Sequence, residues 1–282
     1  MKTKIMYGAP VVDALENLNK HLISTFEVKP KLGIITVNGG DDASKVYVRN
    51  KLKAAERAGI IAYHYQTSID ELSKTIYQAE EECDGVIIQR PFGESCKTVN
   101  EQFYCDKINL FKDADRLGYK AKGKFYSDEL SMSPCTPLAV MALLDYYGIS
   151  LQGKTAVVIG RSDLVGRPLA ELFLRGNATV TVCHSKTPKE TLKKICKQAD
   201  IIVCAAGVPK LLTRDMVKKG AVVVDVSINR DSDGKLCGDA DFENLIGKVA
   251  AITPVPKGIG PITVAELMTN TVTLSIANNF GK

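Results

Sequence analysis

The stretch that decides the fold is TAVVIGRSDLVGRP, residues 155–168. Residues 155–159 form a β-branched and apolar run, and Gly160 ends this run before a helical pattern begins. A strand that passes through glycine into a helix is typical of a nucleotide-binding α/β domain. The spacing departs from the usual dinucleotide pattern, because Ser162 stands where a second glycine is expected and Arg161 precedes it. A guanidinium in a phosphate-binding turn requires an explanation.

Strand and helix patterns alternate along both halves of the chain. Strands are predicted at 31–37, 60–66, 85–90, 155–160, 178–183, 201–205 and 221–226, and helices at 11–26, 43–58, 69–82, 136–147, 165–175, 188–199 and 213–219. The alternation predicts an α/β fold with parallel sheets and helices on both faces. Residues 94–134 are polar and poorly periodic, and Pro134 and Pro137 mark a boundary after them.

We therefore expect two domains. The first is an N-terminal α/β domain at 1–134, joined by a C-terminal helix at 268–282. The second is a Rossmann-type domain at 135–267, in which Gly160 permits the tight turn and Gly166 permits close packing of helix on sheet.

The composition is that of a globular protein in an aqueous compartment: 45% of the 282 residues are hydrophobic and 24% are charged. A net charge of +5 from scattered lysines argues against nucleic acid as the main partner and suits a small anionic ligand. No apolar run has membrane-spanning length and the N-terminus has no signal-peptide core, so a cytoplasmic location is expected. The eight cysteines form no C-x-x-C pair and only three histidines accompany them, which predicts buried free thiols rather than a metal site.

The end of the strand at 178–183 indicates which cofactor binds. This strand runs into CHSKT, where Ser185 and Lys186 stand in place of the Asp or Glu that NAD enzymes commonly carry. A hydroxyl and a cation suit a 2′-phosphate, and Arg161 can reach the same group as a bidentate donor. We therefore predict NADP. The alternative, of equal weight for this motif alone, is that Arg161 is a solvated side chain on a surface turn.

The first half holds polar residues at positions where ligands bind in α/β folds. Tyr47 and Lys51 are four residues apart, so they share one face of a helix as a stacking surface and an acid/base group. Gln89 falls at the carboxyl end of a buried strand, and Asp115 lies in the loop KDAD. Each has an ordinary alternative: an exposed Lys with a half-buried Tyr, a structural amide, a solvated carboxylate. The Pro- and Gly-rich stretch at 253–271 predicts a pocket wall or a domain junction.

With these residues in view, the sequence resembles the bifunctional methylenetetrahydrofolate dehydrogenase/cyclohydrolase family over nearly its whole length. The segments that carry the resemblance are YVRNKLKAAERAGI (47–60), CDGVIIQRP (83–91), KDAD (112–115), SPCTPLAVMALL (133–144), VVIGRSDLVGRPLAELFL (157–174), DVSINR (225–230), GKLCGDADF (234–242) and TPVPKGIGPITVAELMTNT (253–271). The resemblance implies that the first domain is the folate-binding, catalytic domain and that the second binds NADP, with the active site in the cleft between them. It also implies no metal and a homodimer. It also implies tetrahydrofolate derivatives, with or without a polyglutamate tail, as substrates in one-carbon metabolism and purine biosynthesis.

The family resemblance also implies residue roles. Lys51 is the central acid/base residue and Gln89 modulates it by hydrogen bonding. Tyr47 stacks on the folate, Asp115 accepts hydrogen bonds from the pterin, and Pro261 contacts the substrate. The residues that line the NADP site are Gly160, Arg161, Ser162, Ser185 and Ile228.

Five positions depart from the family pattern, Arg90, Gly93, Arg116, Ser227 and Lys257, and the segment before Tyr47 is one residue longer. If the three cations line the folate cleft, they raise the positive potential around Lys51 and disfavour the methenyl cation that hydride transfer creates. This hypothesis makes the dehydrogenase the weaker activity. Two other readings stay open: a degenerate paralogue that binds folate or nucleotide without full turnover, and another NADP oxidoreductase on a similar frame, such as a shikimate-dehydrogenase-like enzyme.

Overall fold

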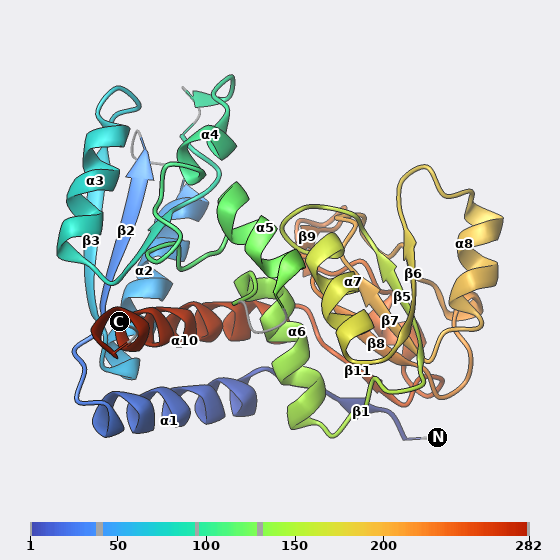
Figure 1. Cartoon of the computed structure of the whole chain (residues 1–282). Coiled ribbons are helices and arrows are strands. Elements are labelled where there is room, and N and C mark those ends of the chain that lie inside the picture. Colours follow the sequence, from blue (N-terminus) through green and yellow to red (C-terminus); the bar gives the residue numbers. More distant parts are fainter. Residues whose placement is uncertain (1, 38–41, 94–95, 129–131, 281–282) are drawn as a thin grey trace. The chain divides into compact units, whose positions relative to one another are not determined.

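The computed structural model describes residues 2–37, 42–93, 96–128 and 132–280. The chain divides into two compact units (Figure 1). The six-stranded unit comprises Met1–Val12 and Thr136–Thr263, and the three-stranded unit comprises Asp13–Cys135 and Val264–Lys282.

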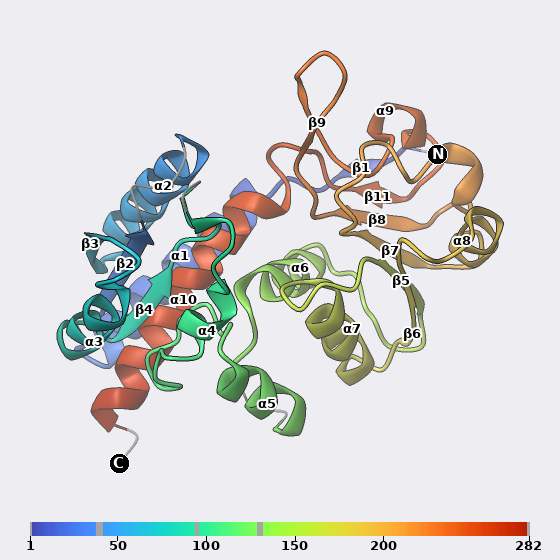
Figure 2. The same cartoon turned by 90° about the horizontal axis from the view of Figure 1, so that it is seen from above.

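The six-stranded unit is built on a parallel sheet in the order β1-β11-β8-β7-β5-β6, which Figure 2 displays from one edge to the other. Its strands are β1 (Lys4–Ile5), β5 (Thr155–Ile159), β6 (Thr179–Cys183), β7 (Ile201–Cys204), β8 (Val222–Asp225) and β11 (Ala251–Ile252). An antiparallel hairpin, β9 (Asn229–Arg230) and β10 (Leu236–Cys237), lies outside this sheet. The strand order reverses direction between β5 and β7, which is the switch point where doubly wound sheets bind ligands.

Apolar strand residues form the core of this unit. All four residues of β7 are buried, as expected for a central parallel strand covered on both faces. The helices are α6 (Cys135–Tyr146), α7 (Gly166–Arg175), α8 (Lys189–Cys196) and α9 (Phe242–Leu245), with a 3-10 turn at Arg214–Met216. Leu192 and Cys196 of α8 pack with Val157 and Ile159 of β5 in one apolar cluster. This packing holds the strand that precedes the glycine turn.

The three-stranded unit contains the parallel sheet β3-β2-β4, formed by β2 (Lys31–Val37), β3 (Ile61–Thr67) and β4 (Gly85–Ile88). Successive residues of β2 serve two different cores, because side chains alternate between the faces of a strand. Leu32 and Ile34 pack with residues of α2 and α10, whereas Ile35 and Val37 pack with residues of α3. The helices are α1 (Ala9–Thr25), α2 (Asp42–Ala58), α3 (Leu72–Glu82), α4 (Glu101–Cys105), α5 (Tyr119–Ser127) and α10 (Ile259–Phe280).

These elements confirm the predicted α/β class, and the differences from the predicted elements have physical causes. The helix predicted at 213–219 is only the 3-10 turn Arg214–Met216. Residues 94–134 contain the short helices α4 and α5, whose polar sequence concealed them. Residues Met1–Val12 cluster with the six-stranded unit, because Lys4 and Ile5 pair in parallel with Ala251 and Ile252. The last two residues of the C-terminal helix predicted at 268–282 lie outside the described residues.

Candidate active site

Lys51 and Gln89 come together in the three-stranded unit. Lys51 lies on α2, one helical turn after Tyr47, whose side chain is 46% exposed. Gln89 directly follows the carboxyl end of β4 and is 7% exposed. The Lys51 Nζ donates a hydrogen bond of 3.0 Å to the Gln89 Oε1, although 38 positions separate the two residues in sequence.

The Gln89 amide has only one orientation that satisfies its contacts. Its Nε2 donates to the Arg90 carbonyl oxygen at 2.7 Å, and a carbonyl can only accept. The Oε1 must therefore face Lys51. The Gln89 backbone N–H donates to the Ile35 carbonyl of the neighbouring strand at 2.8 Å, so the sheet itself places this side chain.

Asp115 lies in a loop that runs beside β4. A parallel bridge joins Val86 of β4 to Asp113, so the chain continues along β4 toward the end where Gln89 lies. Asp113 is buried and its Oδ2 accepts from the Gly118 N–H at 2.9 Å, which closes the loop. Burial raises the pKa of Asp113 to about 6. Asp115 itself is partly exposed.

Helix α10 and Cys135 support this loop, and sequence reasoning missed both contributions. Asn270 is 3% exposed, and its Nδ2 donates to the carbonyl oxygens of Ala114 at 3.0 Å and Ser133 at 3.3 Å. Burial raises the pKa of the Cys135 thiol well above its ordinary value, and the charge of Asp115 acts in the same direction. The signal in the sequence was an Asn within the predicted C-terminal helix, because an amide that is buried needs hydrogen-bond partners.

Glu266 is a further buried acid of the three-stranded unit. It lies on α10, one turn before Asn270, and is 6% exposed. Its negative charge contributes to the raised pKa of the Cys135 thiol, as that of Asp115 does, whereas the Lys51 charge opposes them. Burial raises the pKa of Glu266 to about 7. Lys51, Asp115, Cys135 and Glu266 therefore form one electrostatic neighbourhood.

The hypothesis that additional cations line the folate cleft is wrong for the two arginines of this unit. The Arg90 Nε pairs with the Glu101 Oε2 at 2.6 Å, so its charge is matched locally. Arg116 is 5% exposed, and its Nη1 donates to the Leu110 carbonyl oxygen at 2.7 Å. Burial lowers the pKa of Arg116, and the charge of Asp113 opposes that shift. Neither arginine presents a free cation, so the expectation of a weaker dehydrogenase no longer rests on these two residues.

Two glycines build the turn at the carboxyl end of β5 in the six-stranded unit. Gly160 has φ 143°, and a side chain there would overlap the Ala205 carbonyl oxygen. A side chain at Gly166 would overlap the Gly160 carbonyl oxygen, so the start of α7 lies immediately beside the turn. The Ser162 Oγ accepts from the Val165 N–H at 3.2 Å and supports the start of that helix. Bare backbone at a helix N-terminus fits a pyrophosphate.

Arg161 and Ser185 lie at the same edge of this sheet. Ile159 pairs with Cys183 in the parallel register of β5 and β6, and each of the two residues stands two positions beyond that pair. Both side chains are exposed. Within the described part of the chain, the Arg161 guanidinium makes no hydrogen bond or ion pair, which leaves it available for an anion.

The remaining predicted contacts also belong to the six-stranded unit. Ile228 follows β8 and is 50% exposed, an unusual state for a large apolar side chain. Pro261 is exposed in the first turn of α10. A Cβ placed on the neighbouring Gly260 would lie 3.7 Å from the Ile228 Cδ1, so the start of α10 lies beside Ile228. Lys257 is exposed in the preceding loop, at φ 81°.

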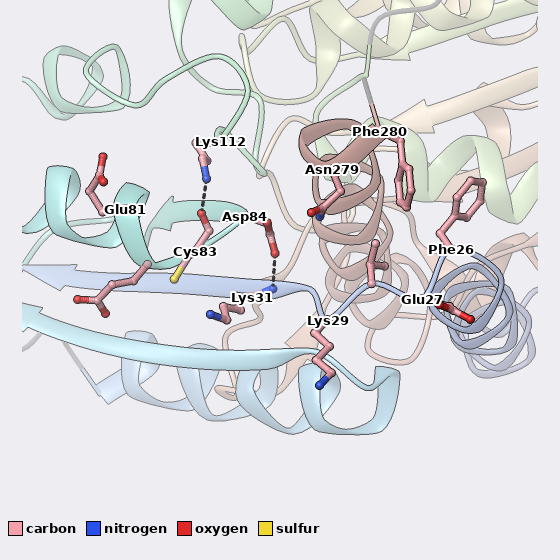
Figure 3. A pocket seen from close by; sticks show the side chains of 12 residues that line it. Phe26, Glu27, Lys29, Lys31, Glu81, Cys83, Asp84, Lys112, Asn279 and Phe280 are labelled. Atoms are coloured by element: carbon pink, nitrogen blue, oxygen red, sulfur yellow. Dashed lines mark hydrogen bonds between the residues drawn. The ribbon is translucent and has the colours of Figure 1, made fainter. Parts of the chain in front are cut away.

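A cavity of about 530 Å³ opens elsewhere in the three-stranded unit (Figure 3). It lies at the amino ends of β2 and β4, opposite the end where Gln89 lies. Lys31 begins β2, and its N–H donates to the Asp84 Oδ2 at 2.9 Å, while the Lys112 Nζ donates to the Cys83 carbonyl oxygen at 2.7 Å. These contacts connect the amino ends of the strands, and none of the predicted site residues line the cavity.

The cysteines confirm the prediction of buried free thiols. All eight cysteines are free, and all except the partly exposed Cys237 are buried. No helix among the described residues combines the length and apolar character required to cross a membrane.

The fold and these two groups of residues define a two-unit α/β protein with a dinucleotide-binding sheet and a lysine-centred polar site. The family models agree. The model described as the catalytic domain of tetrahydrofolate dehydrogenase/cyclohydrolase matches residues 6–115, and the model of its NAD(P)-binding domain matches residues 134–279. The chain belongs to the tetrahydrofolate dehydrogenase/cyclohydrolase family.

Curated relatives and solved structures agree with this assignment. The chain is 47% identical over 251 residues to the bifunctional protein FolD of Campylobacter hominis, covering 87% of this chain and 86% of the relative. The crystal structure of FolD from Campylobacter jejuni is similar with a TM-score of 0.91 and 37% identity, covering 99% of this chain and 100% of that one. FolD from Trypanosoma brucei, complexed with NADP and an inhibitor, has a TM-score of 0.91 and 32% identity, with 99% of both chains covered.

A more distant likeness bears on the alternative of a shikimate-dehydrogenase-like enzyme. A chorismate mutase/shikimate 5-dehydrogenase fusion protein from Clostridium acetobutylicum is 13% identical with a TM-score of 0.51, covering 87% of this chain and 90% of that one. This likeness shows a shared fold alone.

Proposed function

We infer that this protein oxidises methylenetetrahydrofolate to methenyltetrahydrofolate with NADP and hydrolyses the product to formyltetrahydrofolate. Membership of the family supports both activities. The observation that carries the inference is the hydrogen bond of 3.0 Å from Lys51 to Gln89, with the Asp115 loop running along β4 toward the same strand end. An amine, an amide and a carboxylate in one neighbourhood supply a proton acceptor, a group that orients it and an acceptor for ligand N–H groups.

The residues of the six-stranded unit fit NADP. The bare turn of Gly160 and Gly166 suits the pyrophosphate, and Arg161 with Ser185 suits the 2′-phosphate. Ser162 and Ile228 complete the proposed cofactor contacts. NADP, when bound, accepts a hydride from the methylene carbon of the substrate.

The residues of the three-stranded unit orient the folate and handle protons. Tyr47 offers an exposed aromatic face one turn from Lys51, on which a pterin ring can stack. Asp115 accepts hydrogen bonds from the pterin amino and ring N–H groups, and Pro261 adds a substrate contact. In the hydrolysis, water adds to the methenyl carbon and the Lys51 amine accepts its proton. Gln89 holds the amine in place through one N–H.

We further propose that the protein is a cytoplasmic homodimer that serves one-carbon metabolism and purine biosynthesis, with or without polyglutamate on its substrates. The resemblance to the family supports this proposal, as does the scattered positive charge of the chain, which suits an anionic folate tail. Size-exclusion chromatography with light scattering tests the dimer: a monomer at micromolar concentration contradicts it.

The variant Lys51→Met tests the assignment. It keeps much of the apolar stem of the side chain and removes the amine, so the hydrolysis of methenyltetrahydrofolate should fall by about a hundredfold or more. The matched control is Lys53→Met, two positions along the same helix and exposed. NADPH formation and loss of methenyltetrahydrofolate are followed separately by absorbance. Absence of both activities in the unmodified protein would overturn the function, and an undiminished hydrolysis rate in Lys51→Met would remove this residue from it.

A further inference from the structure

Asp239 is a fully buried acid that no step above uses. It lies between β10 and α9 and has no exposed surface. Five donors bind its carboxylate: the backbone N–H groups of Ala206 at 2.7 Å, Gly207 at 3.1 Å and Val208 at 2.8 Å, the Ser227 Oγ at 2.7 Å and the Asn229 Nδ2 at 2.8 Å. A buried carboxylate is costly unless it is paired or fully hydrogen-bonded, and within the described part of the chain this one is bound by neutral donors alone.

The five donors come from two loops at the ligand-binding edge of the sheet. Residues 206–208 follow β7, and residues 227–229 follow β8. Cys204 pairs with Asp225 in the parallel register of these strands, so both loops leave the sheet side by side. This is the edge at which the Gly160 turn and Arg161 also lie. Asp239 therefore joins two neighbouring loops where parallel sheets bind dinucleotides.

Ile228 is fixed between two of the donors. The residues on either side of it, Ser227 and Asn229, both direct their side chains to Asp239. The Ile228 side chain points outward and is 50% exposed, so core packing does not set its position. The carboxylate holds the backbone on both sides of it instead, and pre-organises an apolar contact before any ligand arrives.

We propose that Asp239 is a positioning residue for the dinucleotide: its carboxylate holds residues 206–208 and Ile228 in the conformation that receives the cofactor. The proposal rests on the proposed function, because it assumes that this edge binds NADP. Asp239 touches neither substrate nor cofactor in this scheme and acts through the two loops. Ser227 contributes one of the five hydrogen bonds, so its share in positioning the two loops is smaller.

The variant Asp239→Asn tests this role. An amide keeps the shape but turns an N–H₂ group toward groups that are themselves donors. Losing charge-assisted hydrogen bonds at this position should raise the KM and Kd for NADP about tenfold or more, with a smaller change in kcat. The ratio of dehydrogenase kcat/KM to the cofactor-independent hydrolysis rate should therefore fall by about the same factor. The matched control is Asp241→Asn, two residues along, whose carboxylate accepts, among the described residues, only from the Asn244 Nδ2 at 2.7 Å.

A second pair of variants keeps the test decisive if Asp239→Asn does not fold. Ser227→Ala removes one donor and should raise the KM for NADP about threefold to tenfold, and Ser227→Thr should restore it because it keeps the hydroxyl. An NADP affinity that stays at the unmodified level in every variant overturns the positioning role. So does an equal fall of both activities, which marks a general structural defect. Failure of the proposed function is distinct, because the unmodified protein would then lack activity.

Discussion

Glu266→Gln is the change whose effect follows most directly from the structure. Glu266 lies on α10 and is 6% exposed. Among the described residues its carboxyl group has no hydrogen-bond partner, so replacing it with an amide of the same shape breaks no contact. Burial raises the pKa of Glu266 from its ordinary 4.5 to about 7, and no other cause contributes. The carboxylate is thus held in an environment that favours its neutral form.

The sign and the size of the effect follow from proton linkage. A folded-state pKa above the unfolded value means that the folded chain binds more protons between pH 4.5 and about 7. The free energy of unfolding therefore decreases as pH rises through that window, and the full penalty is present above pH 7. Each unit of difference between the folded-state and unfolded-state pKa values is worth roughly 1.4 kcal/mol, so the penalty in the free energy of unfolding is about 3 kcal/mol. Gln carries no charge at either end of the window.

The assay is urea unfolding followed by far-UV circular dichroism at pH 5 and pH 8. The free energy of unfolding of Glu266→Gln minus that of the unmodified protein should be about 2–3 kcal/mol larger at pH 8 than at pH 5. Asp113 and Asp225, whose pKa values burial also raises, are present in both proteins and cancel in the difference. Exposed Glu56→Gln on α2 is the control and should show no such change. A relative stability that is the same at both pH values refutes the reasoning.

Three further predictions concern the two sites. Arg161→Ala should weaken NADP binding by about 1.5–3 kcal/mol and leave NAD binding nearly unchanged, as measured by titration calorimetry. The control is Arg167→Ala, which removes an exposed ion pair of 2.7 Å with Asp163. An equal loss of affinity for both cofactors in Arg161→Ala contradicts the assignment. Gly160→Ala should destabilise the protein by about 2 kcal/mol and reduce NADP binding, because φ is 143° and the new Cβ meets the Ala205 carbonyl; an unchanged denaturation midpoint argues against the close approach. Asn270→Ala should cost about 2–3 kcal/mol, since two buried carbonyls each lose a hydrogen bond. Exposed Thr273→Ala is its comparison in the same denaturant series, and an equal effect of the two contradicts the role of the amide.

Local patterns were sufficient to predict the elements that the fold is built from. The apolar run 31–37 coincides with β2, and the run at 155–160 becomes β5 with Gly160 as its end. Periodicity and backbone sterics are properties of neighbouring residues, so they can be read from the chain. The two-residue strands β1 and β11 could not be found in this way. Each is too short to carry a period, and each exists because distant strands pair with it: β1 pairs with β11, 247 positions away, and β11 also pairs with β8.

Charge showed the limit of sequence reasoning most clearly. By itself the sequence determined the α/β class, the glycine turn, and the residue types available for proton and phosphate chemistry. Only the tertiary structure decided which charges are free: Arg90 meets Glu101, Arg116 is buried against the Leu110 carbonyl, and Arg161 stays open. It also decided that Lys51 meets Gln89 and that Asp239 gathers five donors from two loops. The physical reason is that burial and hydrogen bonding depend on partners distant in sequence, whereas periodicity and turn geometry depend on near neighbours.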